Sequence, residues 1–144
     1  MIVALVVFAL DRITKSVVAA NVPKGTEIPV IGHLVGITNL DNSGAAFGLA
    51  PAGTPIFAIA SVVVAIGLAI YVARTPGDVR TDAVLGLIMG GTVGNGIDRL
   101  IYGTVTDFIN VHFWPVFNVA DSAVSIGVAA LLVGYVLFKP RAAA

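Results

Sequence analysis

The sequence contains no cysteine and few charged residues. Without cysteine the chain can form no disulfide bond, no thiolate metal site and no cysteine nucleophile. Lysine, arginine, aspartate and glutamate together make up 11% of its 144 residues, and the formal net charge is zero. A neutral chain has no electrostatic basis for binding nucleic acid, so we expect no nucleic-acid partner.

Apolar residues dominate what is present. They make up 58% of the chain, and the mean hydropathy is +1.00. This is more apolar surface than a water-soluble domain of this length needs, so the composition indicates an integral membrane protein. We expect a single domain over residues 1–144. The first apolar run is interrupted by the charged sequence DRITK rather than followed by a cleavage site, so we do not expect a removable signal peptide.

Four segments are predicted to span the membrane, over residues 2–22, 54–73, 83–102 and 118–138. Between the first two, residues 23–51 contain short β-like runs at 27–31 and 34–40. This segment could pair with an extended peptide, or it could be a surface hairpin that only connects two helices. Residues 103–117 are expected to form a second surface loop. The predicted fold class is therefore an all-α membrane protein, a four-transmembrane-helix bundle with a small β-like segment outside the membrane.

The basic residues predict the orientation of the chain. Arg74 and Arg80 lie in the connection 74–82, which we expect to be a loop, and Lys139 and Arg141 lie at the C-terminus. By the positive-inside rule this connection and both termini are cytoplasmic. Residues 23–51 and 103–117 are then external.

Carboxylates and amides interrupt the last two predicted spans and the segment between them. They include the carboxylates of Asp98, Asp107 and Asp121 and the amides of Asn95 and Asn118. A charged side chain at the centre of a bilayer costs roughly 2.5–3.5 kcal/mol on insertion scales, so these groups should face protein or a wet cavity. This stretch therefore carries the candidate functional site.

A row of small residues leads to one of these carboxylates. Gly86, Gly90 and Gly94 repeat every four residues, and the next position on the row is Asp98. This small-xxx-small pattern lets helices approach closely. We expect a neighbouring helix to pack on this row, and the row itself leads to a polar site at Asp98.

The first span has its own polar face, formed by Asp11, Thr14 and Lys15 at helical spacing. Two interpretations stay open. The face supports the polar site, or it is a helix end from which Lys15 extends to the membrane interface. The second span, 54–73, is apolar or small throughout and is predicted to be scaffold.

Asp107 and Asp121 stand at the outer ends of consecutive elements, in a setting that suits peptide hydrolysis. Two nearby carboxylates in a dehydrated pocket share one proton. The ionised partner can take a proton from water while the protonated partner polarises the scissile carbonyl. The side chains expected to orient them are Asn95, Asn118 and an Asp98–Arg99 pair.

Two other functional classes remain open at this point. A proton- or ion-translocating protein also buries carboxylates, which relay charge. A carrier should show polar residues along a whole path, whereas here they gather near one face. A purely structural membrane protein would not need so many buried aspartates and asparagines. The sequence has no His-Glu-x-x-His or comparable ligand spacing, so we expect neither a metal nor another cofactor.

Five motifs, taken together, resemble one known family. They are Asp11-Arg-Ile-Thr-Lys15, Asn42-Ser-Gly-Ala-Ala-Phe-Gly48, Gly90-Gly-Thr-Val-Gly-Asn-Gly-Ile-Asp-Arg99, Val105-Thr-Asp-Phe-Ile109 and Phe117-Asn-Val-Ala-Asp-Ser122. Each motif is modest alone. Their order, and their placement around four hydrophobic spans, is similar to lipoprotein signal peptidase, also called signal peptidase II.

The resemblance implies an aspartic peptidase of the bacterial inner membrane, with four spans, both termini in the cytoplasm and an extracytoplasmic β-cradle over residues 23–51. The implied substrates are prolipoproteins already diacylglyceryl-modified on the lipobox cysteine, and cleavage falls immediately before that cysteine. The other implied partners are membrane lipids and globomycin-type inhibitors. We expect a monomer whose active site lies near the external leaflet.

The family's functional positions carry over residue by residue. The implied catalytic pair is Asp107 and Asp121. Arg12 and Thr106 stand where the family commonly has Gln and a second Val, and we expect both departures to be tolerated. The implied supporting and substrate-binding positions are Asp11, Lys15, Asn42, Asn95, Asp98, Arg99 and Asn118.

Overall fold

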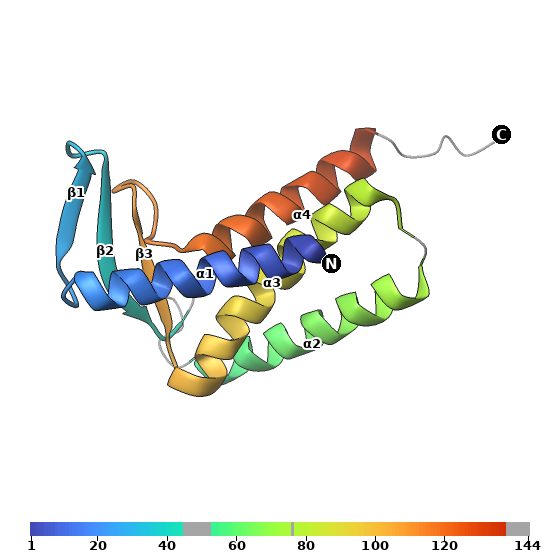
Figure 1. The fold of residues 1–144 in the computed structure, drawn as a ribbon, viewed down its shortest axis with the longest axis horizontal. Coiled ribbons are helices and arrows are strands. Elements are labelled where there is room, and N and C mark those ends of the chain that lie inside the picture. The colour runs from blue at the N-terminus through green and yellow to red at the C-terminus, as the bar shows by residue number, and fades with distance from the viewer. Residues whose placement is uncertain (45–52, 76, 138–144) are drawn as a thin grey trace.

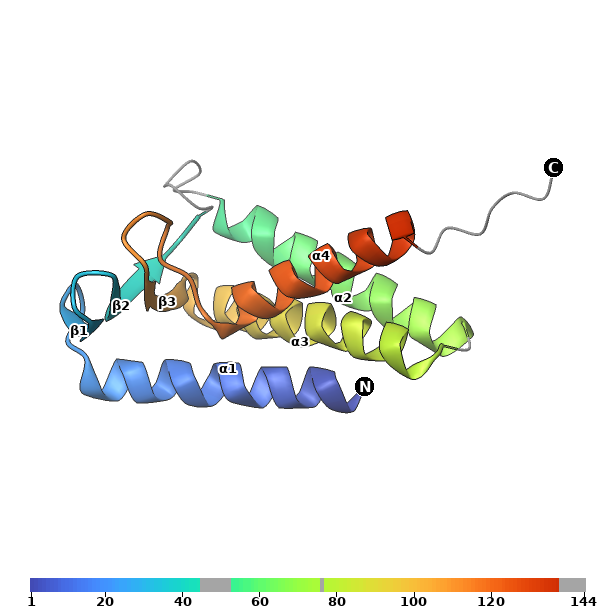
Figure 2. The same cartoon turned by 90° about the horizontal axis from the view of Figure 1, so that it is seen from above.

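The computed structural model describes residues 1–44, 53–75 and 77–137. Within them, helices and a small sheet alternate along the chain. Their bounds are α1 (Ile2–Asn21), β1 (Glu27–Ile31), β2 (Val35–Asn42), α2 (Thr54–Arg74), α3 (Val79–Tyr102), β3 (Val105–Asn110) and α4 (Val119–Leu137). The sheet lies at one end of the helices, and the N-terminus, the α2–α3 turn and the end of α4 lie at the other (Figure 1 and Figure 2).

The central element is α3, which packs against α1, α2 and α4. The glycine row lets it approach α1 closely, because an ideal Cβ on Gly90 would lie 2.6 Å from the carbonyl oxygen of Ala4. Gly86 and Gly94 face the same helix, against Val3 and Asp11. The prediction that a helix packs on this row is confirmed, and that helix is α1.

The sheet is antiparallel, in the order β1-β2-β3. A small apolar core holds it against the end of α1, formed by the buried Val18, Val22 and Phe108. The predicted run 27–31 coincides with β1, and the run 34–40 corresponds to β2, which begins one residue later and continues to Asn42.

The prediction that residues 103–117 form a loop is wrong for their first part, because β3 occupies Val105–Asn110. This strand pairs with β2 on one side, and the backbone of Ile109 bonds to that of Phe117 on the other. It is short, and its one carboxylate breaks the apolar pattern that would mark a strand. The sequence motif Asn42–Gly48 lies only partly within the described residues, since positions 45–48 fall outside them, as do Lys139 and Arg141.

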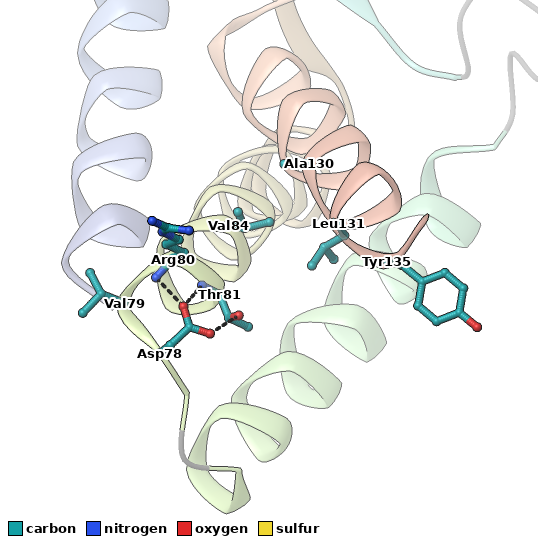
Figure 3. A pocket seen from close by; sticks show the side chains of 9 residues that line it. Asp78, Val79, Arg80, Thr81, Val84, Ala130, Leu131 and Tyr135 are labelled. Atoms are coloured by element: carbon teal, nitrogen blue, oxygen red, sulfur yellow. Dashed lines mark hydrogen bonds between the residues drawn. The ribbon is translucent and has the colours of Figure 1, made fainter. Parts of the chain in front are cut away.

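The expected loop 74–82 is also shorter than predicted. The helix α2 includes Arg74, and α3 begins at Val79. Asp78 caps α3, because its carboxylate accepts hydrogen bonds from the backbone N–H groups of Arg80 and Thr81 at 2.8 and 3.1 Å (Figure 3). An aspartate at the N-cap satisfies amide donors that the first helical turn leaves open, so the helix starts at the first residue after it.

Within the part of the chain that the structure describes, two helices, α2 and α4, are long and apolar enough to cross a membrane by length and composition. They expose many large apolar side chains, including Ile56 at 70% and Val136 at 73%. The helices α1 and α3 carry buried ionic side chains instead, and those side chains meet between the two helices.

Candidate active site

Asp107 lies in the middle of β3 and is 4% exposed. Its carboxylate accepts two amide hydrogen bonds, from Asn42 Nδ2 to Oδ2 at 2.8 Å and from Asn118 Nδ2 to Oδ1 at 2.7 Å. The pKa of this carboxyl is raised to about 6, chiefly by burial and in addition by the charge of Asp121, while the hydrogen bonds from the two amides act in the opposite sense. An aspartate with this pKa can hold or release a proton near neutral pH.

Asp121 lies in the first turn of α4 and is held by a reciprocal cap. Its Oδ2 accepts from the backbone N–H of Asn118 at 3.2 Å, and Asn118 Oδ1 accepts from the backbone N–H of Asp121 at 2.9 Å. This is the geometry of a capping box, in which two side chains satisfy open donors at the helix start. The same bonds that begin α4 therefore fix the Asp121 carboxylate.

Asn118 connects the two carboxylates and is fully buried. Its side chain bonds to Asp107 while its backbone N–H bonds to Asp121. A second amide completes the arrangement, because Asn95 Nδ2 donates to Asp121 Oδ1 at 2.7 Å. The structure thus brings together Asp107 and Asp121 from β3 and α4 around amides from α3, β2 and the start of α4.

An ionic cluster lies behind Asn95, between α1 and α3. Lys15 Nζ donates to Asp11 Oδ2, Asp98 Oδ2 and Asn95 Oδ1, at 2.8, 2.8 and 2.7 Å. All of these residues are buried, with Asp11 at 0% and Lys15 at 5% exposure. Lys15 therefore does not extend to the membrane interface, and it is instead bonded to Asn95 beside the candidate pair.

Two expected contacts differ in detail. Thr14 does not join the cluster, because its hydroxyl bonds back to the carbonyl oxygens of Leu10 and Asp11 within α1. The expected Asp98–Arg99 pair does not form either. The carboxylate of Asp98 bonds to Lys15 and Arg12 of α1 instead, because consecutive helix positions point in different directions.

Arg99 faces a groove between α2, α3 and α4. Its guanidinium lies 5.4 Å from the ring centroid of Phe57, and its Nη1 donates to the carbonyl oxygen of Asn95 at 3.5 Å. The groove has a volume of about 420 Å³, and Asp121 contributes to its lining. The second predicted span thus contributes Phe57 to the wall of this groove.

A second cavity lies away from these carboxylates. It measures about 840 Å³ and opens between the first turn of α3 and the last turns of α4, where Arg80, Leu131 and Tyr135 line it (Figure 3). The close packing of α4 on α3 at Gly127 does not continue to Gly134. An ideal Cβ on Gly127 would lie 2.6 Å from Ile88, whereas one on Gly134 would meet nothing within 4 Å.

Sequence reasoning missed three residues that contact the site or support it. Arg12 was considered a tolerated departure, but it bonds to both Asp11 and Asp98. Asn39 is buried in β2 and donates to the carbonyl oxygen of Val22, which ties the sheet to the end of α1. The third residue is Phe57. No spacing in the sequence marks any of the three. An asparagine within a short apolar run is, however, a sequence signal that could have drawn attention to Asn39.

Comparison with known proteins places this site in context. A family model described as Signal peptidase (SPase) II matches residues 3–138. A protein of Halothermothrix orenii named lipoprotein signal peptidase is 42% identical over 134 residues, covering 93% of this chain and 92% of that protein. Its namesake in Bacillus subtilis is 37% identical over 140 residues, covering 94% and 91%.

A solved structure described as a bacterial membrane enzyme, determined by the in meso method at 2.3 Å resolution, shares the fold. It superposes with a TM-score of 0.86 at 29% identity, covering 99% of this chain and 92% of that one. The match of the family model over almost the whole sequence, together with these relatives, decides the assignment: the chain belongs to the signal peptidase II family.

Proposed function

We propose that this protein is an aspartic endopeptidase that removes the signal peptide from diacylglyceryl-modified prolipoproteins, cleaving before the lipidated cysteine. One observation carries the proposal: Asp107 and Asp121, from different elements, are both bonded to Asn118. Family membership supplies the reaction class, and the curated relatives are named for lipoprotein substrates. The paired carboxylates supply chemistry that suits the reaction.

In the proposed mechanism the two aspartates share one proton. The ionised carboxylate removes a proton from the attacking water, and the protonated carboxylate donates a hydrogen bond to the scissile carbonyl oxygen. When the tetrahedral intermediate collapses, a proton passes to the leaving amine. The raised pKa of Asp107, about 6, makes it the better candidate for the protonated partner.

The surrounding side chains have separate roles in this proposal. Asn42 and Asn118 hold Asp107, and Asn95 holds Asp121. Arg99 lies on the groove wall next to Asp121 and is proposed to bind backbone carbonyls of the substrate. The buried support beneath the site is formed by Lys15, Asp11 and Asp98, which do not contact substrate in this proposal.

The proposal places all four helices across the bacterial inner membrane, as one integral domain acting as a monomer. The sheet and the site then lie near the external leaflet, and both termini are cytoplasmic. In this arrangement the diacylglyceryl chains remain in the bilayer while the scissile bond enters the polar site. Each acyl CH₂ kept out of water contributes about 0.8 kcal/mol, so two chains hold the substrate strongly.

The alternative, proton or ion translocation, has less support. The cations Lys15 and Arg12 are both bonded to carboxylates. The cluster is therefore a fixed network of ion pairs rather than a chain of groups that passes protons along. The groove that contains Asp121 is lined mainly by apolar and small side chains. We therefore do not propose a second function.

The experiment that tests the proposal is cleavage of a purified diacylglyceryl-modified prolipoprotein in detergent, followed by mass spectrometry of both products. We expect a cut immediately before the lipidated cysteine, inhibition by globomycin, and little cleavage of the unmodified precursor. Equal rates with and without the lipid would overturn the lipid requirement. The absence of any cut in lipidated substrate would return attention to translocation, which a proton-flux assay in liposomes measures.

A further inference from the structure

Four side chains of α1 and α3 form a closed ring of alternating charge. Lys15 bonds to Asp11 and Asp98, both at 2.8 Å. Arg12 bonds to the same two carboxylates, with Nη2 at 2.9 Å from Asp11 Oδ2 and Nη1 at 2.5 Å from Asp98 Oδ1. Two cations and two anions leave the ring electrically neutral.

Lys15 connects this ring to the candidate catalytic pair. Its third hydrogen bond goes to Asn95 Oδ1, and Asn95 Nδ2 donates to Asp121 Oδ1. An asparagine amide has an acceptor end and a donor end, so the ammonium group at the oxygen fixes the NH₂ towards Asp121. The orientation of the Asn95 amide therefore depends on the position of the Lys15 ammonium group.

Arg12 differs from the other ring members because its side chain is 26% exposed, whereas those of Asp11, Lys15 and Asp98 are at most 6% exposed. It lines a polar pocket of about 390 Å³ between α1, α3 and the sheet. The other charged pair of this pocket, Lys24 and Asp41, is bonded within itself. Arg12 can therefore be replaced without opening a cavity in the protein interior.

We propose that Arg12 is a positioning residue for the peptidase reaction, which keeps the buried ring neutral and so holds Lys15 and Asn95 in register with Asp121. This inference rests on the proposed function. Without Arg12, two carboxylates would compete for Lys15, and Asp98 Oδ1 would lose its bonding partner. The ring would then carry one net negative charge, and Lys15 and Asn95 connect that ring to Asp121.

That uncompensated charge has a measurable consequence. The cations whose charges act on Asp121 are Lys15 of α1 and Arg99 of α3, and the nearby anion is Asp107 of β3. A negative ring offsets the effect of Lys15 and makes ionisation of the pair less favourable. We expect the kcat profile to move to higher pH by about half to one unit when Arg12 is replaced by a neutral residue.

The test compares Arg12→Gln, Arg12→Lys and a matched control, Arg80→Gln, which removes an exposed arginine beside the remote cavity. Cleavage of lipidated substrate is measured from pH 5 to 8, with KM and the thermal midpoint of each variant. We expect Arg12→Gln to shift the kcat profile upward and to lower kcat below pH 6 by about three- to tenfold, with KM within about twofold. Arg12→Lys should restore the profile, and Arg80→Gln should match the unaltered protein.

An Arg12→Gln variant that loses thermal stability but keeps the pH profile of the unaltered protein would overturn the inference, because a purely structural residue behaves that way. If Arg12→Gln fails to fold, Arg12→Lys decides: a profile displaced from that of the unaltered protein would contradict the charge argument. The two proposals fail separately, because failure of the proposed function is loss of cleavage by the unaltered protein itself.

Discussion

At the scale of single residues, Asp107 shows how burial changes the protonation of a carboxyl group. It is 4% exposed, and burial raises its pKa from 3.8 to about 6. The folded protein therefore keeps a proton that the unfolded chain releases as the pH rises from about 4 to 6. By linkage, the stability that this proton provides is fully present below about pH 4 and is lost as the pH rises through 6. Ionisation of this buried carboxyl near neutral pH therefore lowers the stability of the folded protein.

The pH dependence of catalysis follows from the same group. We expect kcat/KM for lipidated substrate to fall as the pH rises above about 6, because the pair then loses its shared proton. The limbs of the profile belong to the pair of aspartates rather than to either one. Initial rates at low substrate concentration from pH 4 to 8 measure this, and a flat profile over that range would exclude a shared proton.

Asn118 combines a structural and a functional role, which two substitutions separate. Asn118→Ser keeps a helix-capping oxygen but removes the amide that donates to Asp107 Oδ1. We expect it to retain most of the stability while kcat falls by about 10²-fold or more. Asn118→Ala should lose activity and also about 1 kcal/mol of stability. Equal activity of Asn118→Ser and the unaltered protein would show that this bond does not position Asp107.

At the scale of elements, the close contact of α1 with α3 sets the geometry of the ionic ring. The glycine row permits that contact, and Gly94 faces Asp11 directly, where an ideal Cβ would lie 2.7 Å from Oδ2. Any side chain on this row pushes α1 away. The ring and Asn95 would then lose their register, because Lys15 moves with α1.

Substitution of one glycine in each of two helices tests this packing. Gly90→Ala places a Cβ 2.6 Å from the Ala4 carbonyl oxygen, and backbone atoms cannot move aside cheaply. We expect a loss of about 1–3 kcal/mol and reduced activity. The matched control is Gly134→Ala, which meets nothing within 4 Å and should be neutral or stabilising by up to about 1 kcal/mol. Thermal unfolding in detergent compares the two, and equal midpoints would refute close packing at Gly90.

The elements also show what the sequence can predict. The helix α2 and the strand β1 begin at the predicted residues, since long apolar runs and short extended runs leave clear patterns. The glycine row correctly predicted a close helix neighbour. The strand β3 was missed because its pairing depends on β2, more than sixty residues earlier in the chain, rather than on a local pattern.

The candidate site divides in the same way. Carboxylates in an apolar context predicted Asp107 and Asp121 as the candidate pair, and the structure brings both to Asn118. The pairing of charges could not be predicted, because it depends on the rotation of α1 against α3. That rotation directs Arg12 to Asp98. Arg99, which follows Asp98 in the sequence, lies on another face of α3.

At the scale of the whole molecule, the account predicts one orientation in the membrane. The sheet and the α2–α3 turn lie at opposite ends of the helices (Figure 1). The chain has no cysteine, so a single introduced one is a unique label. We expect His33→Cys, in the β1–β2 turn, to react with an impermeant maleimide from outside the cell, and Thr75→Cys to react only after permeabilisation. Reaction of Thr75→Cys in intact cells would contradict the proposed topology.

The central claim is that Asp107 and Asp121 carry the reaction, and one measurement tests it most directly. Cleavage of lipidated prolipoprotein is compared for the unaltered protein, Asp107→Asn and Asp121→Asn, with globomycin binding as the check of folding. The account predicts that both variants bind the inhibitor and that each loses about 10³-fold or more in kcat. If either variant cuts at a rate near that of the unaltered protein, that aspartate is structural, the pair does not act as proposed, and Asp98 becomes the next carboxylate to test.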